Sequence, residues 1–236
     1  MNNLIFRYYP QPISDEDILL EKKIFKYSMV IPMLFILTFW LIKIIEITLD
    51  IHFIELGNYP RHLKGLTGIL TSPLIHSNFA HLIGNSTSFL ILATTLFFFY
   101  RGVAIKVFIL NYLISGFLLW LIGREAWHIG ASGVIYGLTT FLLLSGIIRH
   151  DLRLLTISLI VTFLYGGFIW GIFPIDPEIS WDGHLSGAIS GIFLAIVFHK
   201  YGPPQQKYDW EEESELDVES DENEAYIENN KPDKSQ

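Results

Sequence analysis

The chain of 236 residues contains no cysteine. Disulfide bridges, metal sites with thiolate ligands and a cysteine nucleophile are therefore excluded, while the redox compartment stays undetermined. Any reaction that this chain carries out has to use serine, histidine, aspartate, asparagine or the backbone. This restriction narrows the candidate chemistry before any motif is considered.

Several motifs of hydrolytic sites are also missing. The sequence has no HExxH, the pattern of zinc metalloproteases, and no GxGD, a pattern of aspartyl proteases. The nucleophile elbow of soluble hydrolases, G-x-S-x-G, fails because Val134 occupies the position of its second glycine. A metal site shared by His76, His81 and His184 is a minor alternative, since no carboxylate accompanies the three rings. We therefore expect neither a metal nor another cofactor.

Charged residues make up 17% of the chain, whereas hydrophobic residues make up 51% and aromatic residues 15%, and the mean hydropathy is +0.40. This composition is too apolar for an ordinary soluble domain and predicts a membrane protein. The net charge of −8 is concentrated at one end: residues 203–236 contain twelve Asp or Glu and three Lys, which leaves about +1 for residues 1–202. We expect 203–236 to be a disordered cytosolic tail, and we expect no nucleic-acid partner.

Six segments are long and apolar enough to cross a bilayer core, which takes about 20 helical residues. They are residues 28–47, 79–99, 104–122, 132–148, 154–173 and 184–200. The first is too long for a signal peptide and lacks a cleavage site of small residues, so we interpret it as a retained anchor. The sequence thus predicts an all-α polytopic membrane protein, with a cytosolic segment over residues 1–27 and a six-helix bundle over residues 28–202.

Lysine and arginine are unevenly distributed between the two sides of this predicted bundle. On the side where the two termini lie, lysine and arginine occur at positions 7, 22, 23, 26, 101, 106, 149, 153 and 200. On the other side they occur at positions 61, 64 and 124. The positive-inside rule then places both termini in the cytoplasm, in what we take to be a bacterial inner membrane. The second, fourth and sixth segments begin at the outer leaflet, and Asn58 lies in the first outer connection.

Polar clusters open these three segments. The stretches are HSNFAHLIGN at 76–85, GASG at 130–133 and WDGHLSG at 181–187, and the predicted topology puts them at one depth. Polar side chains at such a depth are costly and usually functional. Their coincidence therefore indicates one shared site.

Ser132 is either a small residue that allows close helix packing or a nucleophile. Glycines four residues apart, at positions 133 and 137 and at positions 183, 187 and 191, give the fourth and sixth segments small-residue faces on which two helices can approach closely. This approach would bring His184 near Ser132, where a neutral imidazole can take the proton of the hydroxyl. Asp182 is expected to cap the sixth helix, and a triad through Asp182 is the lesser alternative.

Acyl transfer also needs hydrogen-bond donors for the oxyanion. His81 and Asn85 are four residues apart and share one helix face, and the N–H of Ser132 adds a backbone donor at a helix N-terminus. His76 is expected to order the entry to this helix. Interhelical hydrogen bonding is the structural alternative for the pair His81 and Asn85.

Taken together, these motifs resemble those of the rhomboid intramembrane serine proteases. The resemblance rests on GASGVIYG at 130–137, HLIGN at 81–85 and GHLSGAISG at 183–191, in family order, and it covers roughly residues 28–200. It implies that Ser132 is the nucleophile and His184 its general base, with His81, Asn85 and the Ser132 N–H in the oxyanion hole. Gly130, Gly133 and Gly187 would support this site.

The resemblance further implies that the partners are transmembrane substrate proteins, cleaved near the outer ends of their helices, together with the lipid bilayer. One stretch of the sequence departs from the family pattern, and another is a candidate for a function known in the family. LKGLTGILT at 63–71 replaces a Trp-Arg pair found in the first outer loop of some bacterial members, and YGGFIWGIF at 165–173 is a candidate lateral gate or an aromatic interface anchor.

Two other functions compete with proteolysis. A catalytically silent rhomboid-like protein would bind transmembrane clients, but such a protein is expected to lack the serine or the histidine. A small transporter or channel is disfavoured because neither a charged residue at mid-membrane nor an inverted repeat is apparent. The oligomeric state stays open.

Overall fold

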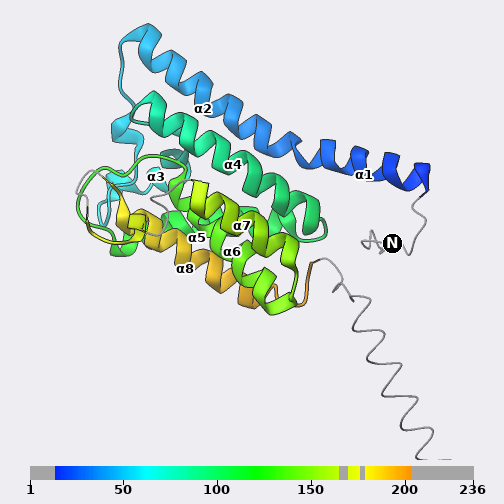
Figure 1. Cartoon of the computed structure of the whole chain (residues 1–236). Coiled ribbons are helices and arrows are strands. Elements are labelled where there is room, and N and C mark those ends of the chain that lie inside the picture. Colours follow the sequence, from blue (N-terminus) through cyan, green and yellow to red (C-terminus); the bar gives the residue numbers. More distant parts are fainter. Residues whose placement is uncertain (1–13, 165–169, 176–178, 203–236) are drawn as a thin grey trace, which may run out of the picture. The chain divides into compact units, whose positions relative to one another are not determined.

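The computed structural model describes residues 14–164, 170–175 and 179–202, and within these ranges it is built from helices and loops without a β-strand (Figure 1). The predicted all-α fold is therefore confirmed. The acidic tail at 203–236 lies outside the described residues, as do the first thirteen residues.

Eight α-helices and four 3₁₀ turns follow one another in the described parts of the chain. The helices are α1 Asp15–Ser28, α2 Val30–Leu49, α3 Gly68–Thr71, α4 Phe79–Phe99, α5 Ala104–Ile122, α6 Ser132–Arg149, α7 Leu152–Leu164 and α8 Trp181–Val197. The 3₁₀ turns are η1 Ile54–Leu56, η2 Leu63–Gly65, η3 Ser72–Leu74 and η4 Trp170–Ile172.

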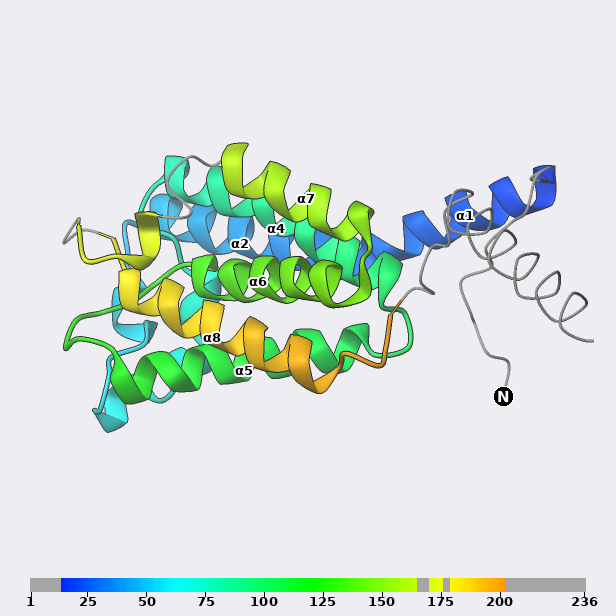
Figure 2. The same ribbon diagram turned by 60° about the horizontal axis from the view of Figure 1, so that its bottom comes forward.

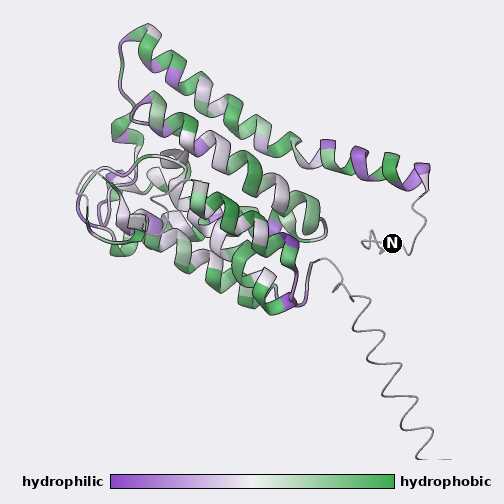
Figure 3. Ribbon diagram, viewed as in Figure 1, coloured by the Kyte–Doolittle hydropathy of each residue, from purple (hydrophilic) through white to green (hydrophobic). Residues whose placement is uncertain are grey.

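Four of these helical stretches are long and apolar enough to cross a membrane: α1 with α2, α4, α5 and α6. The helices α7 and α8 are also apolar but have only 13 and 17 residues, about 20 and 25 Å at a rise of about 1.5 Å per residue. Large apolar side chains remain exposed around the bundle, for example Leu37, Phe163 and Ile196, and Figure 3 shows how much of the helices consists of hydrophobic residues. The protein is an integral membrane protein, because water would not tolerate this surface.

Helix α1 was not expected, since residues 1–27 were predicted only as a cytosolic lead. It begins with a capping box, in which the Ser14 hydroxyl and the Asp17 carboxylate satisfy each other's backbone N–H groups. Acidic residues occupy its first turn and Lys26 its last, which matches the helix dipole. Helices α1 and α2 follow each other as one long rod in Figure 1.

The predicted fifth segment, 154–173, contains α7, which the structure describes over Leu152–Leu164, while residues 165–169 lie outside the described residues. The end of the segment is wrong as an α-helix, because Trp170–Ile172 form the 3₁₀ turn η4. Pro174 disfavours a helical conformation of Phe173, so η4 does not extend past Ile172. Helix α8, by contrast, begins at Trp181, three residues earlier than predicted, so His184 lies in its first turn.

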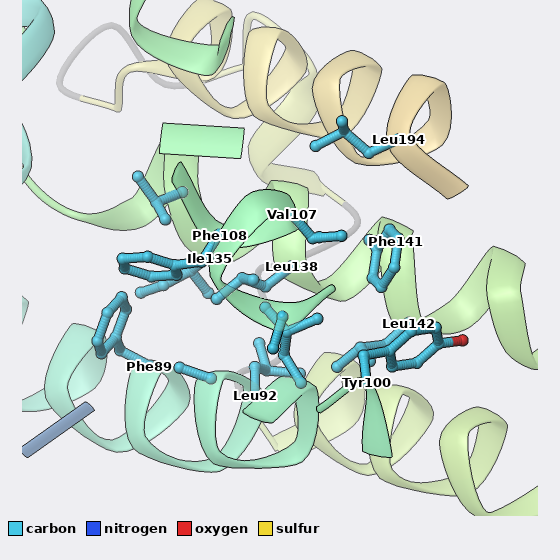
Figure 4. Close-up of a cluster of buried hydrophobic side chains, with 14 of the residues drawn as sticks. Phe89, Leu92, Tyr100, Val107, Phe108, Ile135, Leu138, Phe141, Leu142 and Leu194 are labelled. Atoms are coloured by element: carbon cyan, nitrogen blue, oxygen red, sulfur yellow. The ribbon is translucent and has the colours of Figure 1, made fainter. Parts of the chain in front are cut away.

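Helix α6 packs against α4, α5, α7 and α8, as the rotated view in Figure 2 makes visible. One face of α6 contributes along its length to the main apolar cluster of the bundle. Figure 4 shows this cluster, which includes Phe89, Leu92, Val107, Phe108, Ile135, Leu138, Phe141, Leu142 and Leu194. The core therefore extends along α6 from its first turn, at Val134, to Leu142.

The first half of α6 meets α8 through glycine. A Cβ atom added to Gly187 would overlap the carbonyl oxygen of Gly133, and one added to Gly191 would overlap that of Gly137. The two backbones are therefore in direct contact, and the close approach predicted from the glycine spacing is confirmed.

Candidate active site

A cavity of about 670 Å³ opens at the end of the bundle where α4, α6 and α8 begin. Ser132, His184, His81 and Asn85 all line it. The structure thus brings together the four side chains that the sequence singled out, although they come from three separate helices. Their catalytic roles stay predictions.

Ser132 is the first residue of α6, and Ala131 before it provides no side-chain cap. The first N–H groups of an α-helix have no partner within the helix, so that of Ser132 is a backbone donor at the cavity wall. The chain reaches this position through Gly130, whose φ of 110° is strained for other residues and whose N–H donates to the Ser72 carbonyl over 2.8 Å.

Gly130 also packs against the two candidate oxyanion donors. A Cβ atom placed on it would lie 2.7 Å from Nε2 of His81 and 3.4 Å from Nδ2 of Asn85. Both side chains therefore reach the backbone two residues before Ser132. Asn85 is buried, and its Nδ2 donates no hydrogen bond within residues 14–164, 170–175 and 179–202. A buried donor of this kind needs an explanation, and an oxyanion in the cavity would supply its acceptor.

The ring of His184 is held from two sides. Its Nδ1 lies 2.8 Å from the carbonyl oxygen of Gly171, and the ring stacks on Tyr136 with centroids 4.2 Å apart and an interplanar angle of 10°. A carbonyl can only accept, so Nδ1 carries the proton and Nε2 of the neutral ring is left as an acceptor. Tyr136 lies one helical turn after Ser132, which places the base over the first turn of α6.

Asp182 is not the N-cap residue of α8, although its carboxylate accepts a backbone N–H of the first turn, that of Gly183. It is the second residue of α8, while Ser180 occupies the N-cap position without a capping side-chain bond. The Asp182 carboxylate accepts from the backbone N–H of Arg124 over 2.8 Å and also from Ser180 and Gly183, and it lies 3.6 Å from His128. It holds the α5–α6 loop against the start of α8, while the carbonyl of Gly171 orients His184.

His76 lies in the turn before α4, where a role in ordering the helix entry was predicted. Its ring is buried between Phe39 and His81, with centroid distances of 5.0 and 5.2 Å. Burial of the ring, with a smaller contribution from His81, lowers the pKa of His76 far below its ordinary value. His76 is therefore a neutral packing partner of His81.

The contacts of Gly171 and Tyr136 with His184 were not predicted from the sequence. Tyr136 could have been found, because it lies four residues after Ser132 and so shares its helix face. Gly171 could not, since only the tertiary structure brings it to His184. An added Cβ atom on Gly171 would overlap the hydroxyl oxygen of Tyr136. The candidate gate at 165–173 falls partly outside the described residues, because 165–169 are not described.

The first long connection, which differs from some bacterial rhomboids, is a folded segment. Residues 63–71 form η2 and α3, and the carbonyl of Leu70 accepts from the Tyr112 hydroxyl. Asn58, expected in an exposed loop, is fully buried: it pairs with His128 through both backbone groups, and its side chain donates to the Gly116 carbonyl. This connection thereby supports the loop that leads to Ser132.

No cluster of three or more potential metal ligands occurs among the residues that the structure describes. The polar side chains that line the cavity are hydroxyls, amides, imidazoles, an indole and the guanidinium of Arg124, and no carboxylate is among the described residues that line it.

The comparisons with known proteins point to one family. A family profile described as Rhomboid domain matches residues 63–201, more than half of the chain. Uncharacterized proteins of Mycobacterium bovis and Mycobacterium tuberculosis are each 33% identical over 150 residues, which cover 60% of this chain and 62% of theirs. An uncharacterized protein of Mycobacterium leprae is 34% identical over 142 residues, 56% of both chains. The chain thus spans about three fifths of the length of these relatives, and it belongs to the rhomboid family.

Proposed function

We propose that the protein is an intramembrane serine endopeptidase that uses a dyad of Ser132 and His184. The observation that carries the proposal is the orientation of His184. Its Nδ1 is bonded to the Gly171 carbonyl and its ring is stacked on Tyr136, so Nε2 is the ring nitrogen left to accept a proton, and His184 lines the same cavity as Ser132. A serine becomes a good nucleophile when such a base takes its proton.

In the proposed reaction, Oγ of Ser132 attacks the scissile carbonyl carbon while its proton moves to Nε2 of His184. The tetrahedral intermediate carries its negative charge on the former carbonyl oxygen. Collapse breaks the C–N bond, and the protonated His184 gives its proton to the leaving amine. A water molecule then attacks the acyl-enzyme by the same route, with His184 taking the proton of the water and returning it to Ser132.

The oxyanion would accept from the N–H of Ser132, Nδ2 of Asn85 and Nε2 of His81. The unsatisfied Nδ2 of Asn85 and the contact of both side chains with Gly130 support this assignment. Donors that are already in place when charge develops stabilise the transition state without reorganisation.

We further propose that the substrates are transmembrane helices of other proteins. The residues at the cavity begin three helices of an apolar bundle, so a substrate would arrive through the bilayer, and its paired backbone would have to unwind locally. The positive-inside distribution supports a cytoplasmic location of both termini, with the site toward the outer leaflet of a bacterial inner membrane.

A serine-directed fluorophosphonate probe, combined with cleavage of a test transmembrane substrate, tests the proposal. The purified protein should be labelled and should cleave, and both activities should be lost in Ser132→Ala and in His184→Ala, with the double variant no worse than either. Ser28→Ala is the matched control, since its hydroxyl only donates to the Ile24 carbonyl within α1. Proteolysis by purified Ser132→Ala would refute the mechanism. Client binding without any labelling of the wild type would favour the silent alternative.

Because the chain contains no cysteine, a thiol reagent can label it only at a cysteine introduced for a topology test. Asn58 is buried, so the reporter belongs at Leu63, which is 83% exposed. A cysteine at Leu63 should react with an impermeant thiol reagent added to intact cells. Labelling of a cysteine in the tail instead would reverse the proposed orientation.

A further inference from the structure

Helix α2 contains a buried ion pair that the proposed reaction does not use. Lys43 and Glu46 lie near the end of this apolar helix, with Nζ and Oε2 3.1 Å apart and side chains only 12% and 6% exposed. Charged side chains within a membrane-spanning helix are costly, and they usually have a function.

Lys43 uses its ammonium group to hold a turn of another segment. Besides Glu46, Nζ donates to the carbonyl oxygens of His76 over 3.0 Å and of Ser77 over 3.1 Å. An ammonium has three N–H donors, so all three are used. Glu46 in turn accepts the backbone N–H of Phe53 over 2.9 Å. The pair thus fixes the turn 76–77 to the end of α2.

This turn leads directly to a candidate oxyanion donor. Asn78 caps α4 by accepting the backbone N–H of His81 over 2.8 Å, and the Ser77 hydroxyl lies 3.2 Å from Nδ1 of His81. When this hydroxyl donates to Nδ1, the proton of the neutral ring is on Nε2. Nε2 is the nitrogen that lies against Gly130.

We infer that Lys43, held by Glu46, is a positioning residue for His81: it anchors the backbone of Ser77, whose hydroxyl keeps the N–H of His81 directed at the site of the oxyanion. This inference rests on the proposed function. It adds a requirement for a charge on α2, a helix that contributes no side chain to the cavity.

A double-mutant cycle between Lys43 and His81 tests the inference. Lys43→Met should lower kcat for the test substrate about 10-fold with KM little changed, because the donor matters in the transition state. In a His81→Ala background the same change should have no further effect, since the group it positions is gone. Effects that multiply would overturn the positioning role. Lys106→Met, an exposed lysine of α5, is the matched control and should leave kcat unchanged.

Lys43→Met also leaves Glu46 buried without its partner and can impair folding. Ser77→Ala removes only the hydroxyl that contacts His81 and leaves the ion pair intact, so it should lower kcat less than Lys43→Met. In the His81→Ala background it should likewise leave kcat unchanged. The ¹⁵N NMR shifts of the His81 ring give a readout that does not need turnover. They should show one tautomer in the wild type and a mixture in Ser77→Ala.

The two proposals can fail separately. A wild-type protein that neither cleaves nor reacts with the probe would refute the proposed function, whereas the ring spectra would still decide whether Ser77 and Lys43 fix His81. Identical His81 spectra in the wild type, Ser77→Ala and any folded Lys43→Met protein would overturn the inference whatever the activity.

Discussion

Two faces of α6 are packed by opposite means. One face meets α8 backbone to backbone, through Gly133 and Gly137. Another face contributes Leu138, Phe141 and Leu142 to a cluster of large apolar side chains, without exposed surface. Side chains can repack after a small shift, whereas two backbones in contact have one separation. The comparison teaches that backbone contact fixes the separation of α6 and α8, the two candidate catalytic helices.

Gly187→Ala tests the backbone contact between α6 and α8, and of the changes below it should lower activity most. Its methyl group would overlap the Gly133 carbonyl, so α8 would have to move away from α6 and carry His184 with it. A misplacement of about 1 Å can lower turnover about 100-fold, and we expect kcat/KM for a transmembrane substrate to fall by at least about this factor. Steady-state cleavage in detergent or proteoliposomes measures it.

Gly102→Ala is the control for this prediction, because an added Cβ atom there lies within 4 Å of no atom in the described parts of the chain. It should cleave at the wild-type rate. Equal activity of both glycine variants would show that the separation of the two helices does not set the geometry of the site.

His81→Ala and Asn85→Ala should have the next largest effect. Loss of one oxyanion donor commonly costs about 100- to 1,000-fold in kcat, and the N–H of Ser132 remains in each variant, so we expect the milder end, about 100-fold. Probe labelling of Ser132 should be slowed but not abolished. Wild-type rates in both variants would assign α4 a structural role only.

Leu142→Ala should instead affect stability. The cavity left in the cluster should cost about 2 kcal/mol in free energy of unfolding, at the low end for such a change, because lipid is as apolar as the core and mainly packing is lost. The kcat of the folded fraction should be unchanged. Unfolding in sodium dodecyl sulfate, paired with an activity assay, separates the two quantities. A loss of kcat at full stability would contradict the division between the two faces of α6.

The smallest effect concerns His76. Because its pKa is lowered on folding, the unfolded chain binds more protons below pH about 6.5, and protonation then favours unfolding. As the pH decreases below about 6.5, the free energy of unfolding should decrease, and His76 should account for at most about 1.4 kcal/mol of this loss per pH unit. His76→Phe should show a shallower dependence between pH 7 and pH 5. Identical slopes would mean that the ring is already accessible to protons in the folded protein.

The sequence was most informative where local spacing determines contact. The four-residue spacing of the glycines predicted the contact of α6 with α8, and the spacing of His81 and Asn85 placed both on one face of α4. It was least informative where distant segments meet. No local pattern links Gly171 to His184 or Lys43 to the turn at 76–77, and Asn58 is buried only because its partner, His128, comes from a distant loop.

The carbonyl of Gly171 has a consequence for how the reaction would respond to acid. A carboxylate behind the base would titrate itself, so that activity would fall with two coupled protonations. A peptide carbonyl has no proton to gain in this range, and it presents a dipole rather than a charge to the imidazolium that forms. In the proposed reaction the group behind the base would therefore add no protonation of its own to the acid limb of kcat.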